Sequence, residues 1–446
     1  MPHDANGVPP QPISEPDKNS DQEGKEPQFI ASRRGRMVSL QGLVERIVEE
    51  FAIEHGEGDS DAAKAIVSDV ERRKLVRDVA DYIFGVESVR LSPKEQAYIM
   101  RASYAEIFGY GPLDDYLHDP TITTITLEGA QQMSVRRGIG RELETIDPIF
   151  ETLAHMQRML KRMVRRAGAE LRDDISIIEV GLDIGERRAS LSLAAPPLVA
   201  EMAADIRLHP TEAPTFDDWA SAGIINEKSA TLLQAIIQSE HGLLIVGDTE
   251  SGKTTLLSIL LTQLPALNII TVERTGELTL PENAERRVVQ WRVGDEEGVT
   301  FGTQIRNALE ENPDLIVLDE VRTDEPAMIA PLLSNDDTPR QIWSFRGTTV
   351  TKRLQSALGM LARMADSTQS EHMVYQLHRR LPFIVSLKHR QGQLQVREIA
   401  EWQFSEASAD DTPVYANYVP LLEFADTLTG KYPQNPLDLP ETFWTA

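Results

Sequence analysis

The first apolar pattern along the chain is helical. In LQGLVERIVEEF, apolar residues recur at three- and four-residue spacings, which is typical of an amphipathic helix. This stripe consists of Leu40, Leu43, Ile47, Val48 and Phe51. A second stripe consists of Leu75, Val79, Tyr82 and Ile83. Residues 36–105 are therefore predicted to form a helical bundle, although the pattern alone fits a docking module equally well. Residues 1–35 are polar, rich in Pro and Gly and without periodicity, so we expect a disordered tail.

Strand patterns follow between residues 106 and 207. ITTITL at 122–127 alternates as a strand does, and residues 133–146 read as a hairpin with Gly138 and Gly140 in its turn. A helical stretch then ends at Gly168, and strands IIEVGLDI and RRASLSLAA are separated by Gly185. These patterns predict a small α/β domain over 106–207. The Pro-bearing segment 208–218 is a plausible hinge linker.

From residue 219 onward, short apolar runs alternate with helical patterns. LLIVG, NIITVE, LIVLDE and QIWSF are typical of buried strands, and KTTLLSILLTQL is typical of a helix. Such alternation predicts a parallel sheet with helices on both faces, here over residues 219–404. Residues 405–446, a C-terminal extension, have signals too weak to assign.

The charge balance limits the possible partners. Lys and Arg number 45 against 70 Asp and Glu, a formal charge of −25, which argues against nucleic acid as the main partner. The one basic stretch, residues 161–166, is read as a solvated helix face rather than a phosphate-binding patch. The absence of cysteine excludes thiolate sites and disulfides. No apolar run approaches the roughly 18 residues that span a bilayer, and the polar N-terminus does not read as a signal peptide. We therefore expect a cytoplasmic protein that would serve a membrane only through protein partners.

The strongest chemical signal is a phosphate-binding loop. Residues 247–254 satisfy G-x4-G-K-[ST], with an apolar strand before the loop and a helix after it. Backbone N–H groups of such a loop cradle the phosphates at a helix N-terminus. Lys253 is predicted to reach the β- and γ-phosphates of ATP, and the Thr254 hydroxyl to bind Mg2+. The predicted nucleotide-binding residues are Gly247, Asp248, Thr249, Glu250, Ser251, Gly252, Lys253, Thr254 and Thr255.

A second acidic motif fits the same chemistry. LIVLDE, at 315–320, is a buried strand that ends in two acids. Asp319 is predicted to hold the Mg2+ through water, and Glu320 to orient the attacking water.

Further motifs follow in order along the chain: GYGPLDDYLHDPTITTIT, IIEVGLDIGERRASL, ADIRLHP, NIITVERTGEL with RRVVQWR, and RNALEENPDLIVLDEVRTDEP with Arg306 and Arg322. Together they resemble the type II and type IV secretion ATPases. Among these, the CpaF-like motors of tight-adherence pili look most similar. The resemblance covers residues 75–402. It implies a RecA-like P-loop ATPase domain preceded by a small PAS-like α/β domain and the helical bundle.

The resemblance also implies roles for individual residues. Glu273 would activate water, and Glu320 would be the Walker B glutamate. Arg187 and Arg207 would reach the γ-phosphate from the small domain, whereas without the resemblance they read as surface ion pairs. The family further implies ATP and Mg2+ as cofactors and a homo-hexamer. The hexamer would lie peripherally at the inner membrane, in contact with platform proteins of a pilus or secretion system. A paralogous ATPase would be a further partner.

Three positions depart from the family. Position 250 is Glu where glycine is usual, and at an effective dielectric near 20 its charge should weaken phosphate binding by roughly ten- to a hundredfold. That cost disappears if Glu250 points to solvent or pairs with Arg274, which itself replaces a customary Asp. The family's histidine box appears as WSFRGT, with Arg346 the candidate to sense the phosphate in its stead.

Two functions therefore remain open. The first is an ATP-hydrolysing hexameric motor that powers assembly of a pilus or secretion machine. The second is a catalytically weak or inactive nucleotide-binding member that acts as a structural or regulatory subunit. A DNA translocase is a third interpretation, which the net charge opposes.

Overall fold

The computed structural model describes residues 29–31, 37–56, 68–138, 142–265, 267–334, 337–405, 416–424 and 427–445. The chain divides into two compact units, residues 1–111 and 112–446. Most of the predicted tail lies outside the described residues. Within it, however, β1 (Phe29–Ala31) pairs antiparallel with β2 (Met37–Ser39). The expectation of a tail without regular structure is therefore wrong at these three residues, because a backbone ladder needs no apolar periodicity.

The described part of the first unit contains the helices α1 (Leu40–His55), α3 (Asp69–Glu87) and α4 (Pro93–Phe108). Ser39 caps α1, and Ser92 forms a reciprocal capping box with Glu95 at the start of α4. The predicted first stripe is buried at four of its five positions, with Val48 half-buried. The second stripe is wrong at Tyr82, which is exposed, because α3 turns the Val76, Val79, Ala80 and Ile83 side chains inward.

The second unit begins with a small domain built on one antiparallel sheet. Its strands are β3 (Ile122–Glu128), β4 (Met133–Arg137), β5 (Glu144–Ile146), β6 (Ile177–Ile184), β7 (Arg187–Ala194) and β8 (Ala203–Leu208). Their spatial order is β5-β4-β3-β8-β7-β6. Its helical elements are η1 (Gly111–Leu113), α5 (Asp114–Leu117) and α6 (Leu153–Arg166).

The predicted hairpin exists as β4 and β5, although Gly140 lies outside the described residues. On α6, Arg162 is buried while Lys161, Arg165 and Arg166 are exposed, so the predicted solvated face is wrong at Arg162.

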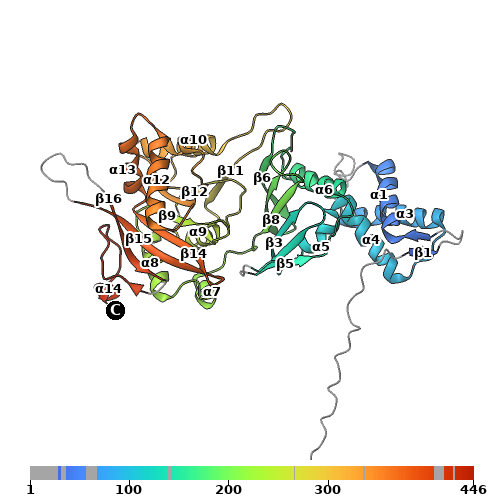
Figure 1. The fold of residues 1–446 in the computed structure, drawn as a ribbon, viewed down its shortest axis with the longest axis horizontal. Coiled ribbons are helices and arrows are strands. Elements are labelled where there is room, and N and C mark those ends of the chain that lie inside the picture. The colour runs from blue at the N-terminus through green and yellow to red at the C-terminus, as the bar shows by residue number, and fades with distance from the viewer. Residues whose placement is uncertain are drawn as a thin grey trace, which may run out of the picture. The chain divides into compact units, whose positions relative to one another are not determined.

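The rest of the unit is organised around a nine-stranded sheet, of order β11-β10-β12-β13-β9-β14-β15-β16-β17 (Figure 1). The strands are β9 (Leu243–Gly247), β10 (Ile269–Glu273), β11 (Ala284–Val288), β12 (Leu315–Val321), β13 (Arg340–Arg346), β14 (Phe383–Arg390), β15 (Gln393–Phe404), β16 (Ala416–Glu423) and β17 (Thr427–Leu428). Every pairing from β11 to β14 is parallel, and every pairing from β14 to β17 is antiparallel. The predicted RecA-like α/β architecture is thus confirmed.

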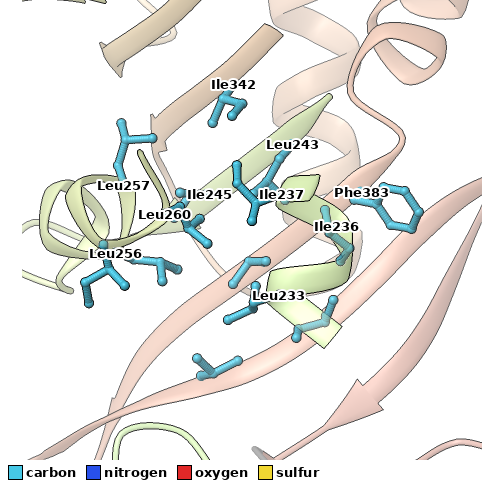
Figure 2. Packing of buried hydrophobic residues seen from close by; sticks show 14 of the residues in the cluster. Leu233, Ile236, Ile237, Leu243, Ile245, Leu256, Leu257, Leu260, Ile342 and Phe383 are labelled. Atoms are coloured by element: carbon cyan, nitrogen blue, oxygen red, sulfur yellow. The ribbon is translucent and has the colours of Figure 1, made fainter. Parts of the chain in front are cut away.

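Helices cover both faces of this sheet. They are α7 (Phe216–Ser221), α8 (Glu227–Gln238), α9 (Lys253–Leu261), α10 (Phe301–Glu310), η2 (Pro326–Ile329), α11 (Ala330–Ser334), α12 (Thr351–Ala365), α13 (Ser370–Arg380) and α14 (Glu441–Thr445). Leu243 and Ile245 of β9 pack with α8 and α9, as Figure 2 shows. The alternate residues Leu244 and Val246 pack with α10, α12 and α13. Burial on both faces explains why the β9 sequence is apolar throughout. Among the described residues, no helix is long and apolar enough to cross a membrane.

The C-terminal extension is part of this sheet. Strands β16 and β17 continue its antiparallel edge, and the segment after them folds back onto β15. There the fully buried Glu401 carboxylate accepts hydrogen bonds from the backbone N–H groups of Gln434 and Asn435, each at 2.7 Å. The sequence signal is weak because this segment is anchored by a buried carboxylate together with irregularly spaced apolar residues, Leu437, Leu439, Phe443 and Trp444.

The packing of α13 on β15 predicts a dependence of stability on pH. The His378 ring stacks on Trp402 with ring centroids 4.0 Å apart, and burial, aided by Arg363, lowers the pKa of His378 from 6.5 to about 4. Between pH 6.5 and 4, His378 is protonated in the unfolded chain and neutral in the folded chain. The free energy of unfolding therefore decreases as the pH falls through this range. In His378→Phe, which keeps the stack, the free energy of unfolding should exceed that of the wild type increasingly over this range, by about 1–3 kcal/mol at its acid end. Chemical denaturation at several pH values measures this, and a pH-independent difference between the two proteins would contradict it.

Candidate functional site

The predicted phosphate-binding loop connects β9 to α9. The loop leaves the sheet at Gly247, and α9 begins directly after Gly252, whose φ of +78° is a conformation that favours glycine. The Lys253 side chain is buried, and its Nζ donates to the Asp248 carbonyl at 2.9 Å. Residues 249–255 line a cavity of about 740 Å³. The loop thus places its backbone and a buried ammonium at the wall of one cavity.

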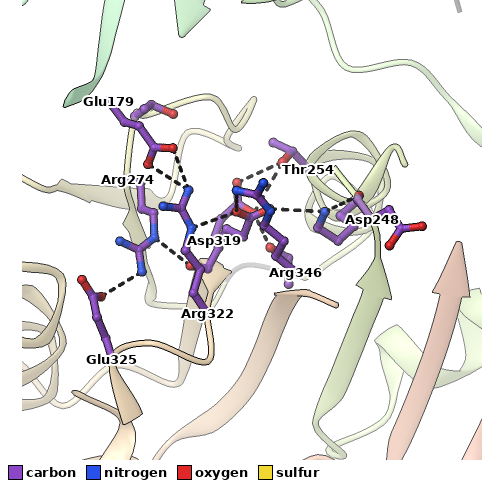
Figure 3. A network of polar contacts seen from close by, with 12 residues as sticks. Glu179, Asp248, Thr254, Arg274, Asp319, Arg322, Glu325 and Arg346 are labelled. Carbon is purple, nitrogen blue, oxygen red and sulfur yellow. Dashed lines mark hydrogen bonds and ion pairs between the residues drawn. The ribbon is translucent and has the colours of Figure 1, made fainter. Parts of the chain in front are cut away.

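Two oxygen ligands for a divalent cation meet beside the loop. The Thr254 hydroxyl donates to the Asp319 carboxylate at 3.1 Å, and the Ser344 hydroxyl also donates to it (Figure 3). Burial, with the negative charges of Glu277 and Glu273 nearby, raises the pKa of Asp319 to about 7. A hydroxyl and a carboxylate at one cavity wall suit Mg2+, which takes its remaining ligands from water and phosphate oxygens. Among the described residues, no cluster of three or more His, Asp or Glu side chains forms a closed metal cage.

Glu320 lies within a group of cations. Its carboxylate is 3.3 Å from Lys253 Nζ, 3.1 Å from Arg322 Nε and 4.0 Å from Arg346 Nη1. Burial alone would raise the pKa of Glu320, but Lys253 and the two arginines outweigh it and lower the pKa. Glu320 is therefore a carboxylate at neutral pH. Arg346, from the altered histidine box, is half-exposed and lines the cavity.

Arg322 also joins the two domains of this unit. Its Nη2 donates to Glu179 on β6 at 3.0 Å, while its Nε contacts Glu320 (Figure 3). Close by, Gly181 of β6 approaches the Thr275 carbonyl so tightly that a Cβ would lie 1.7 Å from that oxygen. The small domain is thus seated against the loop that follows β10.

Glu250 pairs with the small domain rather than with Arg274. Its carboxylate is 2.8 Å from Arg136 on β4 and 3.8 Å from Arg207 on β8. Arg274 instead donates to the Glu320 carbonyl and to Glu325, each at 2.9 Å. The two alternatives considered for Glu250, a pairing with Arg274 and a solvent-facing side chain, are therefore both wrong. The domain opposite supplies the counter-charges.

The two carboxylates of the NIITVERTGEL segment differ in placement. Glu273 is 1% exposed and accepts hydrogen bonds from Thr271, Arg286 and the Leu278 N–H. Glu277 lies at the cavity wall, 3.6 Å from His209 Nε2, and the sequence interpretation missed it. It lies four residues after Glu273 in the quoted motif, so choosing between the two acids required the structure. Burial lowers the pKa of His209, which leaves a neutral imidazole beside Glu277.

The two predicted arginines of the small domain are also placed differently. Arg207 points into the cavity towards Glu250. Arg187 touches the cavity, but its guanidinium donates to the backbone carbonyls of Asp119 at 2.9 Å and Ile122 at 2.8 Å. The structure therefore gives Arg187 a role in holding the start of β7 to the β3 entry. Reaching a phosphate would require these bonds to break.

The amino-acid sequence of this chain is similar to those of several known proteins. Residues 125–336 match the family described as type II/IV secretion system protein. A putative conjugal transfer protein of Mycobacterium tuberculosis is 27% identical over 336 residues, covering 70% of this chain and 93% of that protein. The type IV secretion system protein VirB11 of Brucella suis is 25% identical, covering 52% of this chain and 70% of its own length.

Among solved structures, the Legionella pneumophila ATPase DotB is 14% identical with a TM-score of 0.46, covering 66% of this chain and 79% of that one. The segment that matches the family model, residues 125–336, runs from β3 of the small domain past β12 and includes lining residues from both walls of the cavity. Over residues 125–336, the chain is thus similar to type II/IV secretion system proteins.

Proposed function

We propose that this protein is an ATP-hydrolysing motor of a pilus or secretion machine. One observation carries the proposal: Lys253 and the Thr254–Asp319 pair face a cavity whose opposite wall is a second domain bearing arginines. A site between two domains can convert phosphate contacts into domain movement. The relatives' names, conjugal transfer protein and type IV secretion system protein, support the same class of machine.

The residues divide the chemistry among themselves. Lys253 would exchange its contacts with Glu320 and the Asp248 carbonyl for phosphate oxygens of ATP. Thr254 and Asp319 would hold Mg2+, which supplies charge neutralisation at the phosphates when bound. Glu277, at the cavity wall, is better placed than Glu273 to orient a water molecule. Arg207 and Arg346 would stabilise the charge that develops on the transferred phosphoryl group.

The biological setting follows from the family resemblance. We propose a homo-hexamer in the cytoplasm, peripheral to the inner membrane, that acts on platform proteins of the machine. The tight-adherence pilus branch is proposed on the same basis. A neighbouring paralogous ATPase would be a natural further partner.

A second candidate function is favoured by the Glu250 contacts. An acid in the phosphate loop that holds Arg136 and Arg207 would slow turnover, as would arginine in place of the box histidine. The protein would then be a catalytically weak, nucleotide-binding subunit. The two functions share the site and differ in turnover.

The test of the site itself is Lys253→Ala. Since Lys253 supplies the buried positive charge of the loop, the variant should lose detectable Mg-ATP binding in calorimetry. Lys352→Ala, at an exposed position of α12, is the matched control and should bind as the wild type does. Unchanged affinity in Lys253→Ala would show that nucleotide binds elsewhere.

The two candidate acids can be separated by turnover. Glu277→Gln should lower kcat by at least about tenfold with a smaller change in the Kd for ATP, because its carboxylate faces the cavity. Glu273→Gln should chiefly lower the Tm, since it removes charge from the buried pair with Arg286. A loss of kcat in Glu273→Gln at normal Tm, with Glu277→Gln active, would restore the role first assigned to Glu273.

The arginines give a further comparison. Arg207→Ala should lower kcat by roughly tenfold or more while ATP affinity changes less. Arg187→Ala should instead lower the Tm, because four backbone carbonyls lose their donor. If Arg207→Ala hydrolyses ATP at the wild-type rate, its role is confined to the ion pair with Glu250.

A further inference from the structure

Two arginines of the small domain lie in one row across its sheet. Thr124 on β3 is directly opposite Arg136 on β4 and directly opposite Arg207 on β8. Residues in such a row point to the same face, and strands two apart hold their Cα atoms about 10 Å from each other. Arg136 Nη1 also donates to the Thr124 hydroxyl at 3.3 Å. The sheet therefore fixes two guanidinium groups on either side of one hydroxyl, facing the cavity.

Glu250 inserts its carboxylate between these arginines. Its backbone φ of +61° is in the left-handed region, so the loop holds this side chain in a conformation that glycine would adopt more easily. The Arg136 and Glu250 side chains are 14% and 29% exposed, so the pair is largely shielded from water. Among the described residues, Arg136 Nε is a buried donor without a hydrogen-bond partner. The arginine row thus has donor capacity beyond what one carboxylate uses.

We propose that Arg136 and Arg207 form an anion clamp for the terminal phosphate of the nucleotide, and that Glu250 fills this clamp when no nucleotide is bound. The proposal rests on the proposed nucleotide-binding function. It adds Arg136 to the site as a phosphate-binding residue, and it makes Glu250 an internal competitor of the phosphate. Phosphate binding then requires the Glu250 carboxylate to release the two arginines.

Charge and geometry favour the exchange. A terminal phosphate carries more negative charge than a carboxylate and offers three acceptor oxygens, which suits the forked donors of two arginines. Glu250 is tethered at the loop, whereas the phosphate arrives held by Lys253 beside it. Competition of this kind predicts an effect specific to the third phosphate. Simple repulsion by Glu250 would weaken ATP and ADP alike.

The first measurement compares nucleotide affinities. Glu250→Gln keeps the size and backbone conformation of the side chain and removes its charge. It should tighten binding of a non-hydrolysable ATP analogue with Mg2+ by at least about tenfold, and binding of ADP by much less. Adding Arg136→Gln should cancel the gain. Glu212→Gln, which removes another acid at the cavity rim, is the matched control and should leave both affinities unchanged. Equal gains for ATP analogue and ADP, an equal gain in Glu212→Gln, or no gain in Glu250→Gln would overturn the clamp.

The second measurement needs no nucleotide. Arg136→Gln and Glu250→Gln should each lower the Tm by about 1–4 °C, and the double variant should lose no more than the larger single loss. Additive losses would show that the two side chains are not coupled. If no variant or wild type binds nucleotide while the Tm cycle shows coupling, the proposed function and the phosphate exchange both fail, and the ion pair alone remains.

Discussion

The site depends on how its negative charges are compensated. Glu273, Glu277, Asp319 and Glu320 gather at the carboxyl ends of β10 and β12, where two parallel strands bring them together. Each is met differently: an arginine for Glu273, a neutral histidine beside Glu277, hydroxyl donors for Asp319, and Lys253 with two arginines for Glu320. No cation contacts Asp319 among the described residues, and burial with neighbouring carboxylates raises its pKa to about 7. The sheet order therefore determines the chemistry of the pocket.

Much of the α/β domain over residues 219–404 could be predicted because its signals are local. The loop residues 247–254 are contiguous, and β9 is apolar at every position because helices cover both of its faces. The position of β13 between β9 and β12 could not be read from the sequence, since strand order depends on which strands pair across the sheet. That order is what places Arg346 next to Gly247 in the register.

The less predictable part of the site depends on pairings between distant segments. Arg136 and Arg187 both belong to strands of the small domain, and the sequence does not distinguish their roles. In the structure Arg136 pairs with Glu250, whereas the Arg187 guanidinium donates to backbone carbonyls. Likewise, Glu277 and Glu273 share a motif, and only the loop after β10 decides which carboxylate reaches the cavity. Family resemblance names a residue type at a position, whereas contacts with the opposite wall determine what that residue can do.

Glu250 shows how a local cost is linked to a distant contact. A non-glycine residue in the left-handed region costs about 1–2 kcal/mol relative to glycine. An ion pair at a fully exposed surface would stabilise the fold by less than this backbone cost. The contacts of Glu250 with Arg136 and Arg207 are, however, partly shielded from water by the two domains that form them. The compensation exists only while the small domain lies against the loop. If the domains separated, the backbone cost would remain without compensation, and the charges of Glu250, Arg136 and Arg207 would lose their partners. Glu250 therefore favours contact between the small domain and the loop even without nucleotide.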